Sequence, residues 1–245
     1  MTHAFVDSLP LNQILLGDCC AVLASLPAAS VDFILTDPPY LVGYRDRSGR
    51  SLAGDTDSAW LKPAFREAFR VLKPNRLCVS FYGWSRADLF FDAWKAAGFR
   101  LAGHITFPKR YTSTSRLMRY QHENAYLLAK GNPAAPEFPI GDVIDWTYSG
   151  NKLHPTQKPL SVLTPLIESF CPRGGVVLDP FAGSGSTCLA ARTVGRNYLG
   201  IEIDLATHEV ASRRLAGFMN RISAMIGADS VESGPAVRWP ALAAA

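Results

Sequence analysis

The sequence predicts an α/β fold, in which strands and helices alternate around one sheet. Short apolar runs of strand length recur along the chain, and the stretches between them have helical periodicity. The chain has 245 residues, of which 48% are hydrophobic, and this content is enough for one good core. We therefore expect a single domain over residues 1–226 with modest insertions.

Seven short apolar runs are the expected strands. Two prolines, Pro38 and Pro39, follow soon after the run that ends at Thr36, and a glycine-rich turn follows the run that ends at Leu178. Clusters of proline and glycine are typical of strand ends. In chain order, the expected strands are Gln13–Leu16, Val31–Thr36, Leu77–Phe81, Leu101–Thr106, Asn124–Ala129, Val176–Leu178 and Tyr198–Ile203.

Most of the stretches between these runs have apolar residues at helical spacing. The expected helices are Ala21–Leu26, Trp60–Leu72, Ser85–Ala97, Ser186–Thr193 and Leu205–Phe218. The stretch Lys158–Phe170 is ambiguous. Pro159 suits a first helical turn, whereas Pro165 would lie inside the helix and should kink or split it.

Three segments lack a regular pattern. Leu41–Asp57 is rich in Gly, Arg and Asp, and Gly131–Gly150 is rich in Pro and Gly. Segments of this size inside a compact domain are usually functional loops or locally disordered. The tail over residues 227–245 has too little periodicity to assign, and we expect it to be flexible.

The composition excludes some broad classes of protein. No apolar run reaches the length of a membrane span, and the first residues lack the basic start and apolar stretch of a secretory signal. The five cysteines form neither a paired framework nor a Cys-x-x-Cys metal site, which fits reduced thiols in a cytoplasm. The net charge of +4 permits an acidic partner without requiring one. We therefore expect a cytoplasmic protein with no membrane contact.

The string Asp37-Pro38-Pro39-Tyr40 directly follows the expected strand Val31–Thr36, at the edge where open α/β sheets bind ligands. An exocyclic amine is a poor nucleophile because its lone pair is delocalised into the ring. Two acceptors on its two N–H groups favour the form with a localised lone pair. Asp37 supplies one acceptor, the Pro38 carbonyl is a candidate for the other, and Tyr40 offers a face for a base taken out of a helix. A Pro-Pro turn with a capping Asp fits the same four residues.

A second motif runs from the apolar strand at Val176 through a glycine-rich turn into a helix that begins near Ser186. Gly183 and Gly185 let the backbone pass close to a ligand, and the helix N-terminus adds N–H groups without helical partners. Tight strand-to-helix turns need glycine in any case. The third glycine of the Rossmann dinucleotide fingerprint is missing, because Thr187 and Cys188 follow.

Two further segments support a cofactor site. The next strand ends in an acidic residue about twenty positions after the glycine turn, where a carboxylate suits the two hydroxyls of a ribose. Glu202 is the better candidate, because Asp204 is placed to cap the following helix. Upstream, His154–Pro159 brings together a hydroxyl, an amide and an ammonium that suit the amino-acid end of a cofactor. A proline-stiffened loop is the simpler interpretation of that segment taken by itself.

Together, these motifs resemble those of the amino-methylating DNA methyltransferases, which act on adenine N6 or cytosine N4. In that family Asp-Pro-Pro-Tyr is the catalytic motif and Asp-Pro-Phe-x-Gly-Ser-Gly the cofactor motif. His-Pro-Thr-x-Lys-Pro matches the segment that precedes the cofactor motif. The order found here, with the catalytic motif first and the glycine motif last, resembles the β group of the family. The resemblance spans about residues 12–218.

The resemblance implies an S-adenosylmethionine-dependent methyltransferase fold, which is Rossmann-like. Its sheet is mostly parallel and seven-stranded, with helices on both faces and the motifs in permuted order. It also implies S-adenosylmethionine as the cofactor, direct in-line transfer of the methyl group and no metal. The implied catalytic residues are Asp37, Pro38, Pro39 and Tyr40. The implied cofactor-binding residues are Asp18, Thr156, Lys158, Asp179, Phe181, Gly183, Gly185, Ser186, Thr187 and Glu202.

The resemblance also implies which part of the cofactor some of these residues contact. Thr156 and Lys158 would lie near its methionine end and Glu202 on its ribose. Asp18 matches an acidic position associated with the cofactor's adenine. Gly-Asp is also a common start for a helix after a strand, so a capping role for Asp18 stays open.

DNA recognition is expected in the loops near residues 41–57 and 107–150, because nothing after Asn220 looks like an added DNA-binding domain. Basic residues beside a catalytic loop suit contacts to phosphates or base edges. The expected DNA-contacting residues are Arg45, Arg47, Arg50, Lys109, Arg110, Arg116 and Arg119. Relatives in the β group often form dimers, so a homodimer is a further expectation.

The target base and the substrate class have alternatives. Asp at position 37 favours adenine, because cytosine-N4 enzymes more often carry Ser there. Enzymes that methylate RNA bases or protein glutamine use related Asn-Pro-Pro-Tyr loops, but their glycine motif usually comes first. A catalytically silent DNA-binding relative is the alternative from another class, and it would have no chemical need for both intact motifs.

Overall fold

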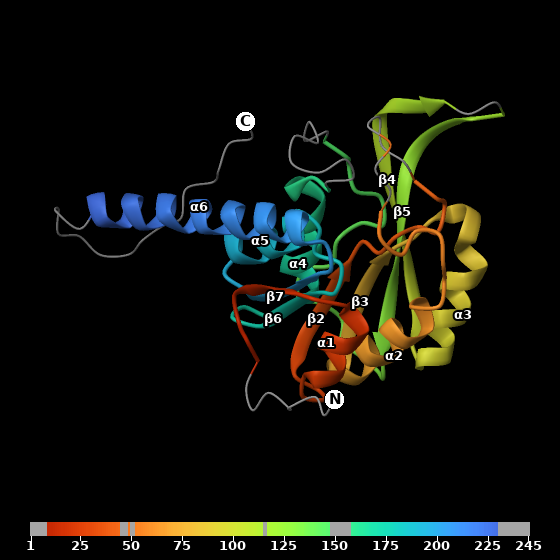
Figure 1. Cartoon of the computed structure of the whole chain (residues 1–245), viewed down its shortest axis with the longest axis horizontal. Helices are drawn as coiled ribbons and strands as arrows, with labels where there is room; N and C mark the ends of the chain where they lie inside the picture. The colour runs from red at the N-terminus through yellow and green to blue at the C-terminus, as the bar shows by residue number, and fades with distance from the viewer. Residues whose placement is uncertain (1–8, 45–48, 50–51, 115–116, 148–157, 230–245) are drawn as a thin grey trace.

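One seven-stranded sheet organises the molecule (Figure 1). The structure is a computed structural model, and it describes residues 9–44, 49, 52–114, 117–147 and 158–229. The strand order is β1-β7-β6-β2-β3-β5-β4. The strands are β1 (Gln13–Leu16), β2 (Val31–Thr36), β3 (Leu72–Phe81), β4 (Arg100–Thr114), β5 (Arg119–Lys130), β6 (Val176–Asp179) and β7 (Asn197–Glu202).

The sheet is parallel from β1 to β3 and antiparallel beyond it. The pairs β1–β7, β7–β6, β6–β2 and β2–β3 are all parallel. Strand β5 runs antiparallel to both β3 and β4. The expected mostly parallel sheet of seven strands is therefore confirmed. The reversed direction of β5 brings the beginning of that strand, rather than its end, to the edge where β2 and β3 end.

Helices cover both faces of the sheet (Figure 1). The helices are α1 (Cys19–Ser25), α2 (Leu61–Val71), α3 (Ala87–Ala97), α4 (Leu160–Phe170), α5 (Ser186–Thr193) and α6 (Leu205–Asp229), with a short 3-10 helix η1 (Trp84–Arg86) before α3. Residues of α1, α2 and α3 pack in one hydrophobic cluster with the sheet, and residues of α4, α5 and α6 pack in another. Among the described residues, no helix is both long and apolar enough to cross a membrane.

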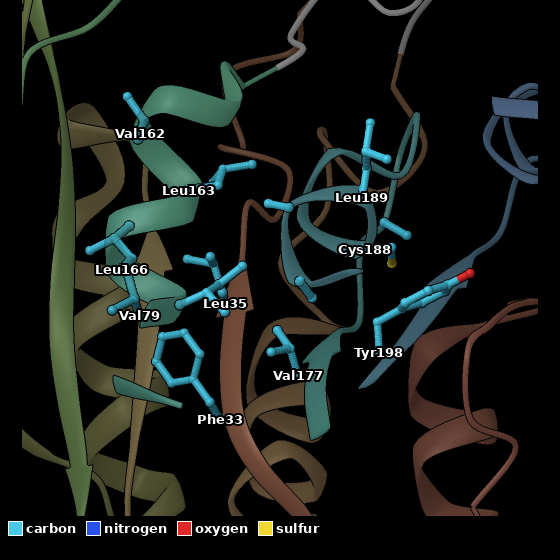
Figure 2. Packing of buried hydrophobic residues seen from close by; sticks show 14 of the residues in the cluster. Phe33, Leu35, Val79, Val162, Leu163, Leu166, Val177, Cys188, Leu189 and Tyr198 are labelled. Atoms are coloured by element: carbon cyan, nitrogen blue, oxygen red, sulfur yellow. The ribbon is translucent and has the colours of Figure 1, made fainter. Parts of the chain in front are cut away.

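The central strand β2 is buried along its whole length, because it lies between the two helical layers. Side chains alternate between the two faces of a strand. Phe33 and Leu35 therefore join the cluster formed with α4 and α5, while Ile34 joins the one formed with α1 and α2. Figure 2 shows Phe33 and Leu35 beside Leu163 and Leu166 of α4. This double burial fixes the end of β2, and with it the position of the residues that follow.

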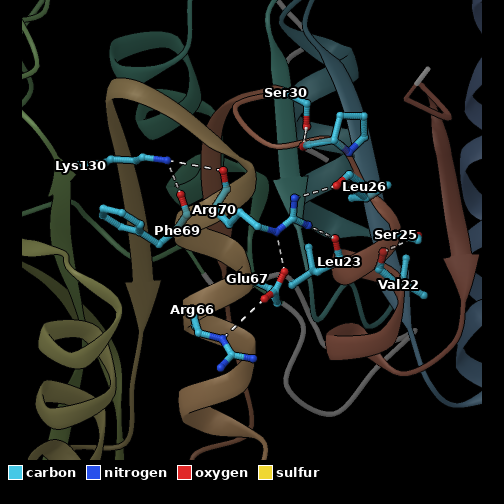
Figure 3. A network of polar contacts seen from close by, with 11 residues as sticks. Val22, Leu23, Ser25, Leu26, Ser30, Arg66, Glu67, Phe69, Arg70 and Lys130 are labelled. Atoms are coloured by element: carbon cyan, nitrogen blue, oxygen red, sulfur yellow. Dashed lines mark hydrogen bonds and ion pairs between the residues drawn. The ribbon is translucent and has the colours of Figure 1, made fainter. Parts of the chain in front are cut away.

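A polar network ties α1, α2 and β5 together (Figure 3). The guanidinium of Arg70 donates to the carbonyls of Leu23 and Leu26 at 2.7 and 2.9 Å, and its Nε donates to Glu67 at 2.6 Å. The last carbonyls of a helix have no partner within the helix, so Arg70 caps the end of α1. Lys130 donates to the carbonyls of Phe69 and Leu72 at 2.5 Å each.

Several elements extend beyond their expected bounds. Strand β3 begins at Leu72 rather than Leu77, and α6 continues past Phe218 to Asp229, so residues 227–229 of the expected flexible tail are helical. The remainder of that tail lies outside the described residues. The ambiguous stretch Lys158–Phe170 contains one helix, α4, with Pro165 inside it, so of the expected kink or split the split does not occur. The missing proline N–H leaves the carbonyl of Ser161 without its helical partner, and this residue is exposed to water.

The largest correction concerns the region expected to be a recognition loop from residue 107 onward. Strand β4 continues to Thr114 and β5 begins at Arg119, so the two strands form an arm that projects from the sheet (Figure 1). Backbone pairing continues out to Thr114 and Arg119, after a register shift between Pro108 and Ser113. Isolated bridges then tie residues 143 and 146 back onto β4.

Candidate active site

The two sequence motifs meet at one edge of the sheet. Asp37–Tyr40 follows β2, and the glycine turn at 180–185 follows β6. Strands β2 and β6 are direct neighbours, with Phe33 opposite Val177. Parallel neighbours end at the same edge, so segments more than a hundred residues apart in sequence form one site.

The carboxylate of Asp37 is held from two sides. Its Oδ1 accepts a hydrogen bond from the hydroxyl of Tyr40 at 2.8 Å, and its Oδ2 accepts one from the ammonium of Lys158 at 2.5 Å. Lys158 is only 8% exposed, and its ammonium also lies 4.9 Å from the ring centroid of Phe81. Two fixed donors, one of them a buried cation, orient this carboxylate at the end of β2.

Glu123, at the beginning of β5, is a second carboxylate in the same site. It is the second, longer acceptor of the one Tyr40 hydroxyl proton, at 3.3 Å, and it forms a short ion pair with Lys109. Burial by itself would raise the pKa of Glu123, but the positive charges of Lys158 and Lys109 outweigh it and hold the pKa below its ordinary value. Burial, with the charges of Asp37 and Glu123, raises the pKa of Tyr40 well above its ordinary value. Tyr40 is therefore a neutral hydroxyl between two carboxylates.

The chain after Tyr40 is folded around a buried acid, Asp55. Its carboxylate accepts from the backbone N–H groups of Leu41, Val42 and Tyr44, at 2.7, 3.3 and 2.5 Å. Asp55 is 1% exposed, and a buried carboxylate requires such donors. This part of the unassigned segment is thus a turn that fixes the path of the chain after the Asp37–Tyr40 motif.

The glycine turn after β6 leaves open space above its backbone. Gly183 has φ +52°, a conformation that glycine adopts without steric cost, and a Cβ placed there would meet no atom within 4 Å. Below the turn, Asp179 is buried and accepts from the backbone N–H of Phe181 at 3.1 Å. Burial raises the pKa of Asp179 to about 7, against the opposing hydrogen bonds from Thr187 and Phe181. Asp179 supports the turn from inside.

Helix α6 supports the same turn from the other side. Arg214 donates to the Ser184 carbonyl and to the Ser186 hydroxyl, at 3.0 Å each. Ser186 and Thr187 are both buried, so of the residues in this motif Phe181 and Gly183 are the more accessible. The ring of Phe181 lies against Trp60, with the ring centroids 4.9 Å apart.

Glu202 and Asp18 lie at the neighbouring ends of β7 and β1. Glu202 accepts from the backbone N–H groups of Gly183 and Asp204, at 2.8 and 2.9 Å, which leaves further lone pairs on each oxygen. Burial raises its pKa above the ordinary value, and these hydrogen bonds oppose the shift. Asp18 caps α1, since its Oδ1 accepts from the N–H of Ala21 at 2.9 Å. The backbone N–H of Gly17 donates to the carbonyl of Glu202 at 2.8 Å and links the two ends.

The expected DNA-contacting residues occupy different places. Arg110 and Arg119 are exposed on the arm of β4 and β5. Lys109 is instead turned inward, where Glu123 neutralises it and Trp146 lies 5.3 Å from its ammonium. Four of the expected DNA contacts and one expected cofactor residue lie outside the described residues: Arg45, Arg47, Arg50, Arg116 and Thr156.

Sequence reasoning missed Glu123, Trp146 and Asp55. Open α/β sheets bind ligands at the carboxyl ends of their parallel strands, whereas Glu123 lies near the amino end of an antiparallel strand. A buried-type strand that begins with an acid, as in Glu123-Asn124-Ala125, is the signal that was available. Asp55 and Trp146 lie in irregular segments, where no periodicity marks a buried residue.

The cysteines contribute to packing. All five are free, and four of them are buried. Among the described residues, one group has three potential metal-ligand atoms within 4.8 Å of one another, namely Asp18, Cys19 and Cys20. A carboxylate oxygen of Asp18 already caps α1, and the Cys20 thiol faces the carbonyl of Trp60 at 3.8 Å. The group therefore has a structural explanation at the start of α1.

Comparisons with known proteins converge on one family. Residues 31–213 match the DNA methylase family of N6 and N4 methyltransferases. YubD of Escherichia coli K12, provisionally named a methylase, is 56% identical over 206 residues, which cover 84% of this chain and 91% of YubD. TTHA0409 of Thermus thermophilus, provisionally named a DNA modification methylase, is 25% identical to this chain. The structure of its complex with S-adenosylmethionine matches 83% of this chain and 93% of that one, with a TM-score of 0.66. The cytosine-N4-specific PvuII DNA methyltransferase has the same fold, with a TM-score of 0.68 at 16% identity over 86% of this chain and 94% of that one.

Proposed function

Because the chain belongs to the N6/N4 DNA methylase family and uses S-adenosylmethionine, we propose that it methylates the N6 amine of adenine in DNA. The observation that carries this proposal is the position of Asp37. Its carboxylate lies at the end of β2, between the glycine turn after β6 and the side chains of β3 and β5. An acceptor at that point faces both a methyl donor and an amine.

The residues at the β6–β7 edge fit the cofactor. The space above Gly183 is open, and Glu202 retains acceptor capacity beside it for the two hydroxyls of a ribose. Phe181 offers an apolar surface at the same turn. We assign these three residues to the cofactor and Asp179, Ser186 and Thr187 to the support of the turn. When bound, S-adenosylmethionine supplies an electrophilic methyl group on a sulfonium.

Asp37 performs the central step on the amine. Accepting a hydrogen bond from one N–H localises the nitrogen lone pair and makes it available for the new N–C bond. The carbonyl of Pro38 is our candidate for the second acceptor. Once the N–C bond forms, the nitrogen must lose a proton, and Asp37 is the base within hydrogen-bonding reach. Lys158 and the Tyr40 hydroxyl hold the carboxylate in place during both steps.

Tyr40 and Lys158 shape the place where the base would lie. The hydroxyl of Tyr40 is bonded to Asp37, so the edge of its partly buried ring points at the amine acceptor. The Lys158 ammonium lies 5.4 Å from the centroid of that ring. We assign Tyr40 to stacking on the extruded base. Lys158 is assigned to orienting Asp37, in addition to the cofactor contact that the family motif implies.

The choice of adenine rests on one residue. Asp is more typical of adenine enzymes at the first position of this motif, whereas cytosine-N4 enzymes more often have Ser. The fold by itself does not separate the two, since the PvuII enzyme that shares it is cytosine-N4-specific. Cytosine N4 is therefore the second candidate. Exposed Arg110 and Arg119 support DNA rather than an uncharged substrate, because guanidinium groups pair with phosphates.

The proposal is tested by incubating the protein with S-adenosylmethionine and unmethylated plasmid DNA, followed by base-resolved mapping of methyl groups. Methyl groups on adenine N6 at a defined sequence are the expected result. Methyl groups on cytosine N4 would show that the base assignment is wrong. Parallel reactions on RNA test the RNA-base alternative. The Asp37→Asn variant is the control, since it should lack the transfer and retain the cofactor.

A further inference from the structure

An exposed tryptophan stands directly beside the catalytic motif. Trp84 begins η1 immediately after β3, the neighbour of β2 on the side away from the glycine turn. It is 61% exposed, and no other tryptophan among the described residues is exposed. Its ring lies on that of Tyr120 in β5, with centroids 5.4 Å apart and planes inclined by 31°. We call Trp84 and Tyr120 the aromatic shelf.

The shelf is fixed relative to Tyr40. Gly83 packs so closely on the catalytic motif that a Cβ there would lie 2.7 Å from the carbonyl oxygen of Tyr40. Two residues after Trp84, the Nε of Arg86 donates to the carbonyl of Leu41 at 3.2 Å. On the other strand, Tyr120 is three residues before Glu123, which accepts from the Tyr40 hydroxyl. Both members of the shelf are thus tied to the residue assigned to stacking on the target base.

The residues around the aromatic shelf suit a ligand that carries several negative charges and has flat apolar rings. Arg86 is exposed two residues after Trp84, Arg119 is exposed one residue before Tyr120, and Arg110 is exposed on the adjoining strand β4. The same arm exposes Leu117 by 86% and Met118 by 63%. A large aromatic surface left in water beside cations is the arrangement with which proteins bind nucleobases of unpaired strands, through ring stacking and phosphate contacts.

The sheet order separates this surface from the cofactor. The glycine turn and Glu202 follow β6 and β7 on one side of β2, whereas Trp84 and Tyr120 belong to β3 and β5 on the other side. The cofactor and the shelf therefore flank Asp37 from opposite directions. A ligand on the shelf does not compete with the cofactor.

We propose that the Trp84–Tyr120 shelf binds a second nucleobase of the DNA, one that loses its stacking partner when the target base enters the site at Asp37. Removing one base from a duplex leaves its neighbour with an unstacked face, which costs free energy that an aromatic surface recovers. The inference rests on the proposed function only in taking DNA as the ligand. It adds a base-binding site to the amine-binding site.

The test measures binding without methyl transfer. Fluorescein-labelled single-stranded oligonucleotides are titrated with the wild type and with Trp84→Ala, Trp84→Phe and Phe138→Ala. Phe138 is the matched control, because it is 71% exposed and its carbonyl accepts from Ser169 near the end of α4, at the opposite edge of the sheet. Thermal unfolding and cofactor affinity are measured on each protein to confirm that the fold is unchanged.

Trp84→Ala should weaken oligonucleotide binding by roughly 10-fold or more, the usual effect of losing one base–aromatic stack. Trp84→Phe should retain most of the affinity, and Phe138→Ala all of it. The difference in fluorescence between the wild type and Trp84→Phe gives the emission of Trp84, and the oligonucleotide should quench this emission. Equal affinities for the wild type and Trp84→Ala, or no quenching of that difference, would overturn the proposal.

Oligonucleotides with one abasic site, placed on the 5′ or the 3′ side of the mapped target, locate the stacked base. The effect of Trp84→Ala should vanish for one of the two. The proposal would also be contradicted if Trp84→Ala weakened binding equally to both abasic oligonucleotides and to a duplex that lacks the base opposite the target. If plasmid methylation is absent while Trp84 still binds oligonucleotides, the proposed function fails and the base-binding site stands.

Discussion

The ammonium of Lys158 lies 2.5 Å from Oδ2 of Asp37, on the oxygen that Tyr40 does not use. Each oxygen of the Asp37 carboxylate thus has one donor from the protein and, under the proposed function, a lone pair left for a substrate amine. The carboxylate does not have to reorganise when the amine arrives. The role assigned to Asp37 depends on this arrangement.

Replacing Asp37 by Asn keeps the size of the side chain but removes the charge and half of the acceptor capacity. We expect the single-turnover rate of methyl transfer to fall by about 10²- to 10⁴-fold, the usual contribution of an acid–base or acceptor group. Cofactor affinity, measured by calorimetry, should change little. Asp92→Asn, at an exposed position of α3, is the control and should leave both quantities unchanged. A rate close to that of the wild type would remove Asp37 from the mechanism.

Glu123→Gln removes a negative charge that lies beside Lys109 and Lys158. It also replaces an anionic acceptor of the Tyr40 hydroxyl with a neutral one. We expect kcat to fall by about 10-fold with little change in KM, because the variant disturbs the orientation of Asp37 and Tyr40 rather than DNA affinity. The melting temperature should also fall, since an unpaired buried cation is costly.

The double variant Glu123→Gln/Lys109→Met removes that cation and should recover most of the lost melting temperature, but not the lost kcat. Glu137→Gln, at an exposed site, is the control for the single change. Recovery of both quantities in the double variant would show that Glu123 has only a structural role.

Gly183→Ala places a methyl group in the open space at the glycine turn. We expect the dissociation constant of S-adenosylmethionine to rise by at least about 10-fold, because the protein backbone approaches the ligand closely at such turns. Gly195→Ala is a matched control. It has φ +72°, nothing within 4 Å of an added Cβ, and a position between α5 and β7 away from the site.

Both glycine variants should lose about 1–2 kcal/mol of stability from backbone strain. Only Gly183→Ala should lose cofactor affinity, which calorimetric titration measures. If the two variants lose affinity equally, the effect comes from strain, and the assignment of the turn to the cofactor is wrong.

Asp179 makes stability depend on pH. Its pKa rises from 3.8 in the unfolded chain to about 7 in the folded protein, because burial disfavours the charged form. The folded state therefore binds more protons than the unfolded state between these values, and stability falls as the pH rises through this window. Asp179→Asn removes this contribution. Urea unfolding at pH 5 and pH 8 should show a larger loss for the wild type, by up to about 1.4 kcal/mol per pH unit within the window. Equal losses in both proteins would contradict the shifted pKa.

The sequence predicted the parts of this molecule that follow periodic rules. All seven strands and five helices were found near their expected places, because β2 and its parallel neighbours are buried on both faces and their apolar runs are unmistakable. The meeting of Asp37 with the glycine turn was predictable for the same reason, since parallel strands end at a common edge.

The remaining features arise from pairings that no local pattern encodes. The arm of β4 and β5 has polar and charged residues on its outer half, and its pairing depends on the partner strand rather than on burial. Glu123 reaches the site because β5 is antiparallel, a property of the topology. The inward turn of Lys109 follows from that position of Glu123, so sequence alone assigned this lysine to the DNA surface.

The site around Asp37 contains two ammonium groups and two carboxylates in contact, and their formal charges sum to zero. A neutral cluster produces only a weak field beyond its immediate neighbourhood, so it neither repels an uncharged heterocycle nor draws in a phosphate. Under the proposed function, methyl transfer takes place at the Asp37 site, whereas the arginines of the arm attract the DNA. The rate of encounter with DNA should depend on ionic strength through the arginines of the arm, whereas the rate of transfer from a saturated complex should be nearly independent of salt.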